Sequence, residues 1–240
     1  MISNHNYVVK NPAEGSIMQL IHALYEPVGD GPHPTILTLH GRGANAMDLL
    51  GLAPYLASGR FLVLCPQGPV QMPIGPGAVG YGWYPPAPGA GLPPDVSAVM
   101  SAREQLLAFL DAAVERYPID PSKLLVLGFS QGGVMAYALA LSDPERFAAL
   151  LALSTWLPAE LLDHMADASA AQHLPTLIQH GARDDMVQVE RARESVKTLR
   201  ERRLPLTYRE YDMGHEINGQ SIMDLTAWLQ EKILAPLVTL

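Results

Sequence analysis

The 240-residue sequence has a single cysteine, Cys65, so the chain forms no internal disulfide and no zinc site of four cysteines. Charged residues are also scarce, at 17% of the chain. There are 16 Lys and Arg and 24 Asp and Glu, which gives a net charge of −8. An acidic chain without a basic run is a poor partner for nucleic acid or an anionic membrane. We therefore expect no nucleic-acid partner.

Long hydrophobic runs are absent as well. No stretch reaches the ~20 apolar residues of a membrane span, and the polar residues 1–15 do not resemble a signal peptide. Cys65 ends a short apolar run, which is typical of a buried, inert thiol. These features predict a cytoplasmic protein with no membrane span.

Short apolar runs of strand length alternate with longer amphipathic segments. Most of these runs lack polar alternation, which is typical of parallel strands covered on both faces. Leu206–Tyr211 alternates more and predicts an edge strand, and Met18–Tyr25 predicts an antiparallel strand at the opposite edge. The expected inner strands are Thr35–His40, Arg60–Cys65, Lys123–Gly128, Ala148–Ser154 and Thr176–His180.

Four segments between the strands have helical periodicity. This repeated alternation predicts an α/β fold with a mostly parallel, doubly wound sheet and helices on both faces. At 48% hydrophobic residues the chain can bury a full core, and we expect one domain over residues 1–240. The expected helices are Ser97–Tyr117, Gln131–Leu141, Gln188–Arg203 and Ser221–Leu234.

Pro66–Val96 stands apart because it holds nine prolines and seven glycines among 31 residues. A linker between two domains is one interpretation, but Met1–Cys65 is too short and strand-rich to form a domain alone. Long loops inside compact domains are often functional. We therefore favour a loop at the edge of an active site over a passive surface loop.

Gly128–Gly132 reads GFSQG and fits the pattern G-x-S-x-G. The apolar run KLLVL precedes it and a helical segment follows, which is the strand–turn–helix of a nucleophile elbow. Such a turn exposes the serine, here Ser130, at the carboxyl edge of the sheet. The alternative is a tight glycine-rich turn in which Ser130 only caps the helix.

A serine hydroxyl needs an adjacent base, and in this architecture the acid and then the histidine follow the serine along the chain. His215 follows the last predicted strand and is the expected base. Asp184 and Asp185 follow an inner strand, and spacing alone does not choose between them. A metal site of His180, Asp184, Asp185 and His215 is a weaker alternative, because no metal-specific ligand spacing is present; we expect no metal.

The reaction also needs donors for a developing oxyanion. The N–H of Gln131 opens the helix after Ser130, and the N–H of Arg42 lies in the loop His40–Gly43, whose glycines let the backbone approach a substrate. The Arg42 guanidinium is available for an acidic group or a structural ion pair. His40 precedes Ser130 and is interpreted as a structural hydrogen-bonding residue.

Aromatic and apolar residues near the same sheet edge are candidates for a substrate pocket. Packing of these loops onto the core is an equally weighted alternative. The candidate pocket residues are Trp83, Tyr84, Trp156, Met186 and Val187.

Taken together, the motifs resemble the phospholipase/carboxylesterase family of α/β-hydrolases, relatives of the acyl-protein thioesterases. The resemblance runs from about Thr35 to Leu229 and rests on LHGRG, GFSQGG, HGxxDxxV at His180–Val187 and GHEI at Gly214–Ile217. It implies an α/β-hydrolase fold without a large separate cap domain, and no cofactor. It also implies Ser130 as nucleophile, His215 as base and Asp184, not Asp185, as the acid.

The resemblance favours a serine carboxylesterase that cleaves esters of short to medium acyl chains through an acyl-enzyme. The thioesterase branch usually has an acidic residue after HGxG, where this chain has Ala44. Thr155 stands where a glycine is common. A lysophospholipase or acyl-thioesterase with the same triad is the alternative, and a non-catalytic hydrolase-like binding module is a remote one. The expected partner is a small-molecule ester, with a homodimer as a further option.

Overall fold

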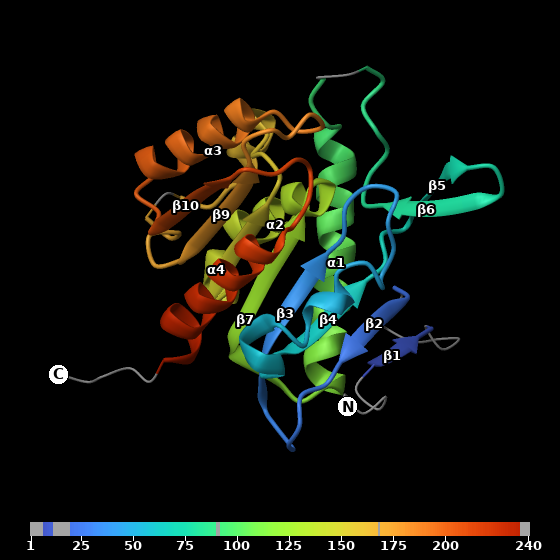
Figure 1. Cartoon of the computed structure of the whole chain (residues 1–240), viewed down its shortest axis with the longest axis vertical. Coiled ribbons are helices and arrows are strands. Elements are labelled where there is room, and N and C mark those ends of the chain that lie inside the picture. The colour runs from blue at the N-terminus through green and yellow to red at the C-terminus, as the bar shows by residue number, and fades with distance from the viewer. Residues whose placement is uncertain (1–6, 12–19, 90–91, 168, 236–240) are drawn as a thin grey trace.

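A computed structural model describes residues 7–11, 20–89, 92–167 and 169–235. Its largest feature is an eight-stranded sheet with the strand order β1-β2-β4-β3-β7-β8-β9-β10 (Figure 1). Neighbouring strands from β4 to β10 pair in parallel, whereas β1 and β2 join the sheet antiparallel. The strands are β1 (Tyr7–Lys10), β2 (His22–Tyr25), β3 (His33–Leu39), β4 (Leu62–Pro66), β7 (Ile119–Phe129), β8 (Ala149–Leu153), β9 (Thr176–Gly181) and β10 (Leu206–Tyr211).

The sheet confirms the predicted inner strands and the edge position of β10. The prediction for the opposite edge was wrong, because β1 lies outside β2 in the described sheet. β1 has four residues, and its Val8 and Val9 are 37% and 53% exposed, so no buried apolar run marks it. Part of the predicted strand Met18–Tyr25 lies outside the described residues. That residues 1–240 form one domain stays a prediction.

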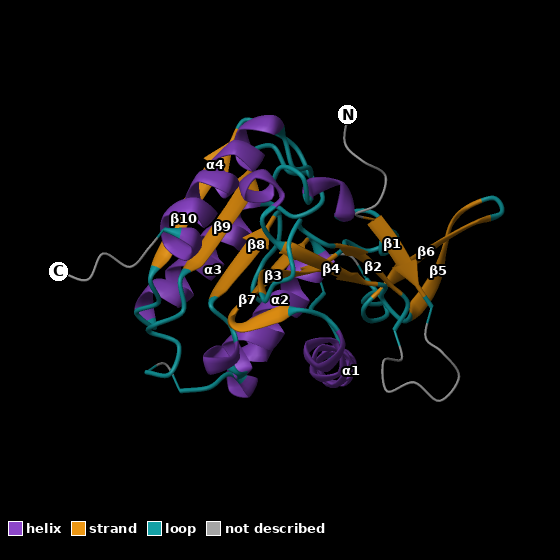
Figure 2. Cartoon of the chain, turned by 90° about the horizontal axis from the view of Figure 1, so that it is seen from below, coloured by secondary structure: helices purple, strands orange, loops and turns teal. Residues whose placement is uncertain are grey.

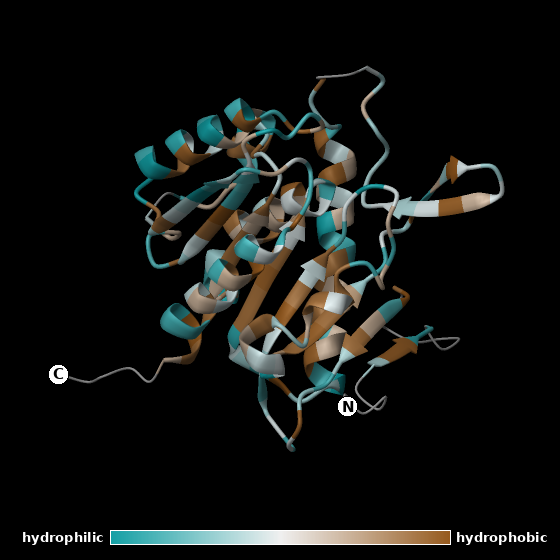
Figure 3. Ribbon diagram, in the orientation of Figure 1, coloured by the Kyte–Doolittle hydropathy of each residue, from teal (hydrophilic) through white to brown (hydrophobic). Residues whose placement is uncertain are grey.

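Side chains of the central strands alternate between two hydrophobic cores, one on each face of the sheet. In β7, Leu124 and Val126 belong to one core, and Leu125 and Leu127 belong to the other. Figure 3 shows the resulting hydrophobic band along the central strands. Because both faces are covered, these strands read as continuous apolar runs.

Helices cover both faces, as predicted. α1, α2 and α3 contribute to the first core, and α4 with the 3₁₀ turns η1 and η2 contributes to the second (Figure 2). Within the described ranges, no helix is both long and apolar enough to cross a membrane, and no separate cap domain covers the sheet. The helices and turns are α1 (Val96–Arg116), α2 (Gln131–Ser142), α3 (Val189–Glu201), α4 (Gly219–Leu229), η1 (Leu50–Leu52), η2 (Leu56–Gly59), η3 (Pro144–Arg146), η4 (Ala159–His164) and the π-helical η5 (Gln230–Leu234).

The segment Pro66–Val96 is not a plain loop. It contains an antiparallel hairpin, β5 (Val70–Gly75) and β6 (Ala78–Gly82), which projects from the body of the molecule (Figure 1). The prediction missed it because the hairpin is largely exposed and its glycines and prolines resemble loop composition. Tyr81 joins it to the loop after β3, since Gly43 N–H donates to Tyr81 O at 2.8 Å and Tyr81 N–H donates to Ala44 O at 2.9 Å.

The turn from β7 into α2 brings a helix against the sheet backbone. A Cβ on Gly132 would lie 2.0 Å from the carbonyl oxygen of Leu39 in β3. A Cβ on Gly133 would lie 2.4 Å from Cβ of Thr155, which follows β8. Only glycine permits this approach. The close contact fixes where Ser130, the residue between β7 and α2, is held.

We expect Leu225→Ala to lower the free energy of unfolding by about 2–5 kcal/mol, because Leu225 of α4 is fully buried in the second core. Met223→Ala is the matched control on the same helix. Met223 is 60% exposed, and its loss should change stability by less than about 0.5 kcal/mol. Urea unfolding of both variants checks this, and equal losses would contradict the assigned face of α4.

We also expect Gly133→Ala to destabilise the fold by about 1–3 kcal/mol, because the new methyl group overlaps the Thr155 side chain. Removing that side chain makes room, so Gly133→Ala with Thr155→Gly should cost less than the sum of the single changes by roughly 0.5–3 kcal/mol. Urea unfolding of the four proteins measures this coupling. Simple additivity would show that the two positions do not touch.

Candidate active site

Ser130 occupies a strained turn at the carboxyl end of β7. Its backbone has φ 53° and ψ −119°, a region that non-glycine residues rarely adopt. Two hydrogen bonds hold it there: Ser130 N–H donates to Leu153 O at 3.0 Å, and the Thr155 hydroxyl donates to Ser130 O at 2.7 Å. Strain of this kind persists only where the surroundings enforce it, and it is common at active sites.

His215, in the loop between β10 and α4, links the serine to a carboxylate. Its Nε2 lies 2.9 Å from Ser130 Oγ, and its Nδ1 lies 2.8 Å from Asp184 Oδ2. The Phe129 ring packs against the imidazole, with the two ring centres 4.9 Å apart. Asp185 is exposed and makes no hydrogen bond to His215, so the structure brings together Ser130, His215 and Asp184.

The Asp184 carboxylate is fully buried and anchored on both oxygens. Oδ1 accepts hydrogen bonds from the N–H groups of Met186 at 3.0 Å and Val187 at 2.8 Å, which leaves Oδ2 for His215. Backbone N–H groups thus fix the direction of the carboxylate. The imidazole proton is thereby held on Nδ1, and Nε2 is left to accept a proton from the serine.

His180 supports the loop that carries Asp184. Its Nε2 lies 2.7 Å from Val187 O and 3.4 Å from Asp184 Oδ2, and burial lowers the pKa of the His180 side chain. This neutral imidazole donates to Val187 O and holds the loop around Asp184. Among the described residues, no group of three or more His, Cys, Asp and Glu is arranged to hold a metal ion.

The loop after β3 lies beside Ser130 and is held by His40. Gly68 N–H donates to His40 Nε2 at 3.0 Å, so the ring proton is on Nδ1, which donates to Gly41 O at 2.8 Å. Burial lowers the pKa of His40 and keeps it neutral. This agrees with a structural role. A Cβ on Gly41 would lie 3.5 Å from Ser130 Cβ, so Gly41 is adjacent to the serine, and Arg42 lines the same cavities as Ser130.

The Gln131 side chain joins the turn to the segment after the hairpin. Its Oε1 accepts from Trp83 N–H at 2.9 Å, and its Nε2 donates to Tyr84 O at 2.9 Å. The Trp83 indole N–H donates to His40 O at 2.8 Å. Trp83 is buried and lines neither cavity described below, which corrects its placement in a substrate pocket and favours the packing alternative. The sequence did not predict the Gln131 side-chain bridge.

Two open cavities meet at Ser130. The larger, of about 480 Å³, is lined by Tyr84, Trp156, Met186 and Val187 among others, so four of the five predicted pocket residues come together there. The smaller, of about 400 Å³, is lined by His215, Phe129 and the loop Gly41–Ala44. Arg42, Ser130 and Met186 line both.

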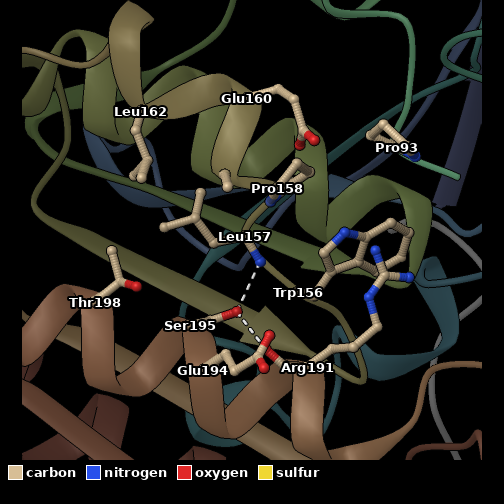
Figure 4. Close-up of a pocket in the computed structure, with 11 residues that line it drawn as sticks. Pro93, Trp156, Leu157, Pro158, Glu160, Leu162, Arg191, Glu194, Ser195 and Thr198 are labelled. Carbon is tan, nitrogen blue, oxygen red and sulfur yellow. Dashed lines mark hydrogen bonds between the residues drawn. The ribbon is translucent and has the colours of Figure 1, made fainter. Parts of the chain in front are cut away.

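Arg191 also lines the larger cavity, and sequence analysis did not single it out. Its guanidinium lies 3.9 Å from the centre of the Trp156 ring. A third, smaller cavity of about 250 Å³ lies next to this pair (Figure 4). The sequence signal was an arginine in the first turn of an expected helix, a position where the helix dipole disfavours a cation.

Comparisons with known proteins find relatives among carboxylesterases and acyl-protein thioesterases. A probable carboxylesterase of Oryza sativa subsp. japonica is 26% identical, with 93% of this chain and 87% of the relative covered. Acyl-protein thioesterase 1 of Mycosarcoma maydis is 25% identical, with 86% of this chain and 94% of the relative covered. A shorter match, to a probable carboxylesterase SOBER1-like of Arabidopsis thaliana, is 27% identical and covers 60% of this chain and 55% of that relative.

A solved carboxylesterase structure from Mesorhizobium loti superposes with a TM-score of 0.78 at 19% identity, with 94% of this chain and 99% of that chain covered, and has the same fold. The family model described as Phospholipase/Carboxylesterase matches residues 23–233. The chain thus has the α/β-hydrolase fold and belongs to the phospholipase/carboxylesterase family.

Proposed function

We propose that this protein is a serine carboxylesterase that uses Ser130 as nucleophile, His215 as base and Asp184 as the acid. The observation that carries the proposal is the continuous hydrogen-bonded chain from Ser130 Oγ through the imidazole to the buried carboxylate. A hydrolase-like binding module would not need this alignment or the strained serine. The family and the named carboxylesterase relatives support the same activity.

In the proposed mechanism, His215 Nε2 removes the Ser130 hydroxyl proton as Oγ attacks the ester carbonyl carbon. Asp184 keeps the imidazole in place and stabilises its charged form. The carbonyl oxygen becomes an anion that the N–H groups of Gln131 and Arg42 stabilise. The N–H of Gln131 suits this role because the first N–H groups of a helix have no acceptor within it. Collapse of this intermediate breaks the ester bond and leaves an acyl group on Ser130.

The position of His215 indicates which cavity would receive the alcohol and which the acyl group. The imidazolium must give its proton to the leaving alcohol oxygen, so the alcohol departs on the side of Ser130 where His215 lies. The smaller cavity is lined by His215 and receives the alcohol. The larger cavity is not lined by His215 and receives the acyl group. A water molecule activated by His215 then hydrolyses the acyl-enzyme.

The lining of the larger cavity bears on which acyl chains it accepts. Its volume of about 480 Å³ is within the range of small-molecule sites, and its wall mixes apolar groups such as Leu92 and Val187 with two arginines. The mixed wall, rather than the volume, supports acyl chains of short to medium length over a long hydrocarbon chain. The acyl-protein thioesterase relative keeps the thioesterase or lysophospholipase alternative open with the same residues. A cytoplasmic location and a homodimer stay predictions.

We expect Ser130→Ala to lower hydrolysis of p-nitrophenyl esters on the order of a thousandfold or more, because no other group replaces the nucleophile. The wild type is assayed with esters from acetyl to palmitoyl. Because each buried methylene adds ~0.8 kcal/mol, the rate profile follows the length that the larger cavity accepts, with a short to medium optimum. A palmitoyl optimum would favour the lipid-type alternative. Equal rates for wild type and a folded variant would refute the serine mechanism.

Asp184 and Asp185 provide a matched pair of neighbouring carboxylates. Asp184→Asn should reduce kcat on the order of a hundredfold or more, because the amide no longer orients and stabilises a charged imidazole. Asp185→Asn should retain most of the rate, since Asp185 is exposed and makes no hydrogen bond to His215. Steady-state kinetics on one short-chain ester distinguishes them. A larger loss in Asp185→Asn would mean that the wrong carboxylate has been assigned.

A further inference from the structure

The larger cavity carries a charge opposite to that of the chain. The protein has a net charge of −8, yet this cavity is lined by two guanidinium groups, Arg42 and Arg191, and by one carboxylate, Asp185. A purely hydrocarbon acyl chain gains nothing from cations in its pocket. Their presence beside Ser130 points to a substrate with negative charge.

The position of Arg191 is not explained by the stability of its helix. Arg191 is the third residue of α3, and a cation in the first turn is disfavoured by the helix dipole. Burial lowers the pKa of the guanidinium from its ordinary value, although the charges of Glu160 and Glu194 oppose the shift. Both effects make this an unfavourable place for an unpaired cation.

Arg191 also lacks a carboxylate partner in the part of the chain that the structure describes. No carboxylate lies within ion-pair distance of its guanidinium, whereas Arg193 of the same helix is bound by Glu210 through two hydrogen bonds of 2.8 Å. Glu160 and Glu194 line the third cavity, of about 250 Å³, which Arg191 and Trp156 also line (Figure 4). The guanidinium thus retains donors for an anion that enters the larger cavity.

The guanidinium is held in place before any ligand binds. It lies 3.9 Å from the centre of the Trp156 ring, a stacked arrangement (Figure 4) that leaves the N–H groups at its edge free to donate. Ser195 Oγ donates to Arg191 O at 2.7 Å and accepts from Leu157 N–H at 2.8 Å, so one hydroxyl ties the backbone of Arg191 to the segment that carries Trp156. A planar donor group held in this way suits a carboxylate, which accepts two parallel hydrogen bonds.

We infer that Arg191 determines specificity by binding a carboxylate on the acyl portion of the substrate, so that the preferred substrates are monoesters of dicarboxylic acids. The inference rests on the proposed function, which places the acyl group in the larger cavity. Arg42 adds positive charge at the same cavity. Trp156 acts as a positioning residue for the guanidinium.

The test compares p-nitrophenyl hydrogen adipate with p-nitrophenyl methyl adipate, whose acyl chains have the same length but end in a carboxylate and in its neutral methyl ester. Suberate and sebacate pairs extend the series to longer chains. We expect wild type to prefer the charged ester in kcat/KM, and Arg191→Gln to reduce the ratio of charged to neutral kcat/KM on the order of tenfold to a hundredfold. Arg191→Lys should keep part of the preference.

Arg200→Gln is the matched control. Arg200 is an exposed arginine on the same helix that does not line the cavity, so this substitution removes the same charge elsewhere. It should leave the ratio unchanged. If Arg200→Gln lowers the ratio as much as Arg191→Gln, the effect is a general one of net charge and the inference is wrong. A wild type without preference for the charged ester in any pair also overturns it.

A binding measurement separates this inference from the proposed function. Calorimetry of monomethyl adipate with the Ser130→Ala protein should show binding that Arg191→Gln weakens about tenfold or more. Ser130-dependent hydrolysis of the neutral ester without Arg191-dependent binding would overturn the inference alone. Arg191-dependent binding without Ser130-dependent hydrolysis of either ester would overturn the proposed function and leave the carboxylate site standing.

Discussion

The contact between the start of α2 and the sheet is the constraint on which the site depends. Gly132 lies against the backbone of β3, and Gly133 lies against the Thr155 side chain after β8, so the helix has no side chain of its own at these two contacts. The chain can enter α2 at this distance only through a sharp turn, and Ser130 takes a positive φ to make it. The hydroxyl is thereby presented to His215 from a backbone that cannot relax without moving two strands.

Buried polar bridges then place the loops around that turn. The Gln131 side chain holds the backbone of Trp83 and Tyr84, and His40 joins Gly41 to Gly68. Hydrogen bonds of this kind are directional, and a missing partner in the interior is costly. Residues that are neither nucleophile nor base thus set where the oxyanion and the substrate would lie.

The sequence predicted the parts of the fold that hydrophobic burial dictates. Covered parallel strands require apolar runs, so β3, β4, β7, β8 and β9 were visible, and the turn at Ser130 followed from its glycines. The exposed β1 and the hairpin β5–β6 bury too little apolar surface to leave such a pattern. The choice between Asp184 and Asp185 was open on spacing, because it depends on which carboxylate receives the N–H groups of Met186 and Val187.

Trp83 and Arg191 show the same limit for side chains. Composition does not distinguish a tryptophan in a pocket from one in a core, and the hydrogen bond to His40 O identifies Trp83 as a core residue. An arginine on a charged helix resembles a solvated residue; its place in the first turn was a weak signal, and Trp156 and the cavity distinguish Arg191 from Arg200. In the proposed mechanism the alcohol leaves on the side of His215, and Arg191 would then lie on the side of the acyl group. The two ends of one substrate would then interact with different groups. The alcohol oxygen would receive a proton from His215, and the acyl group would bind Arg191 through its charge.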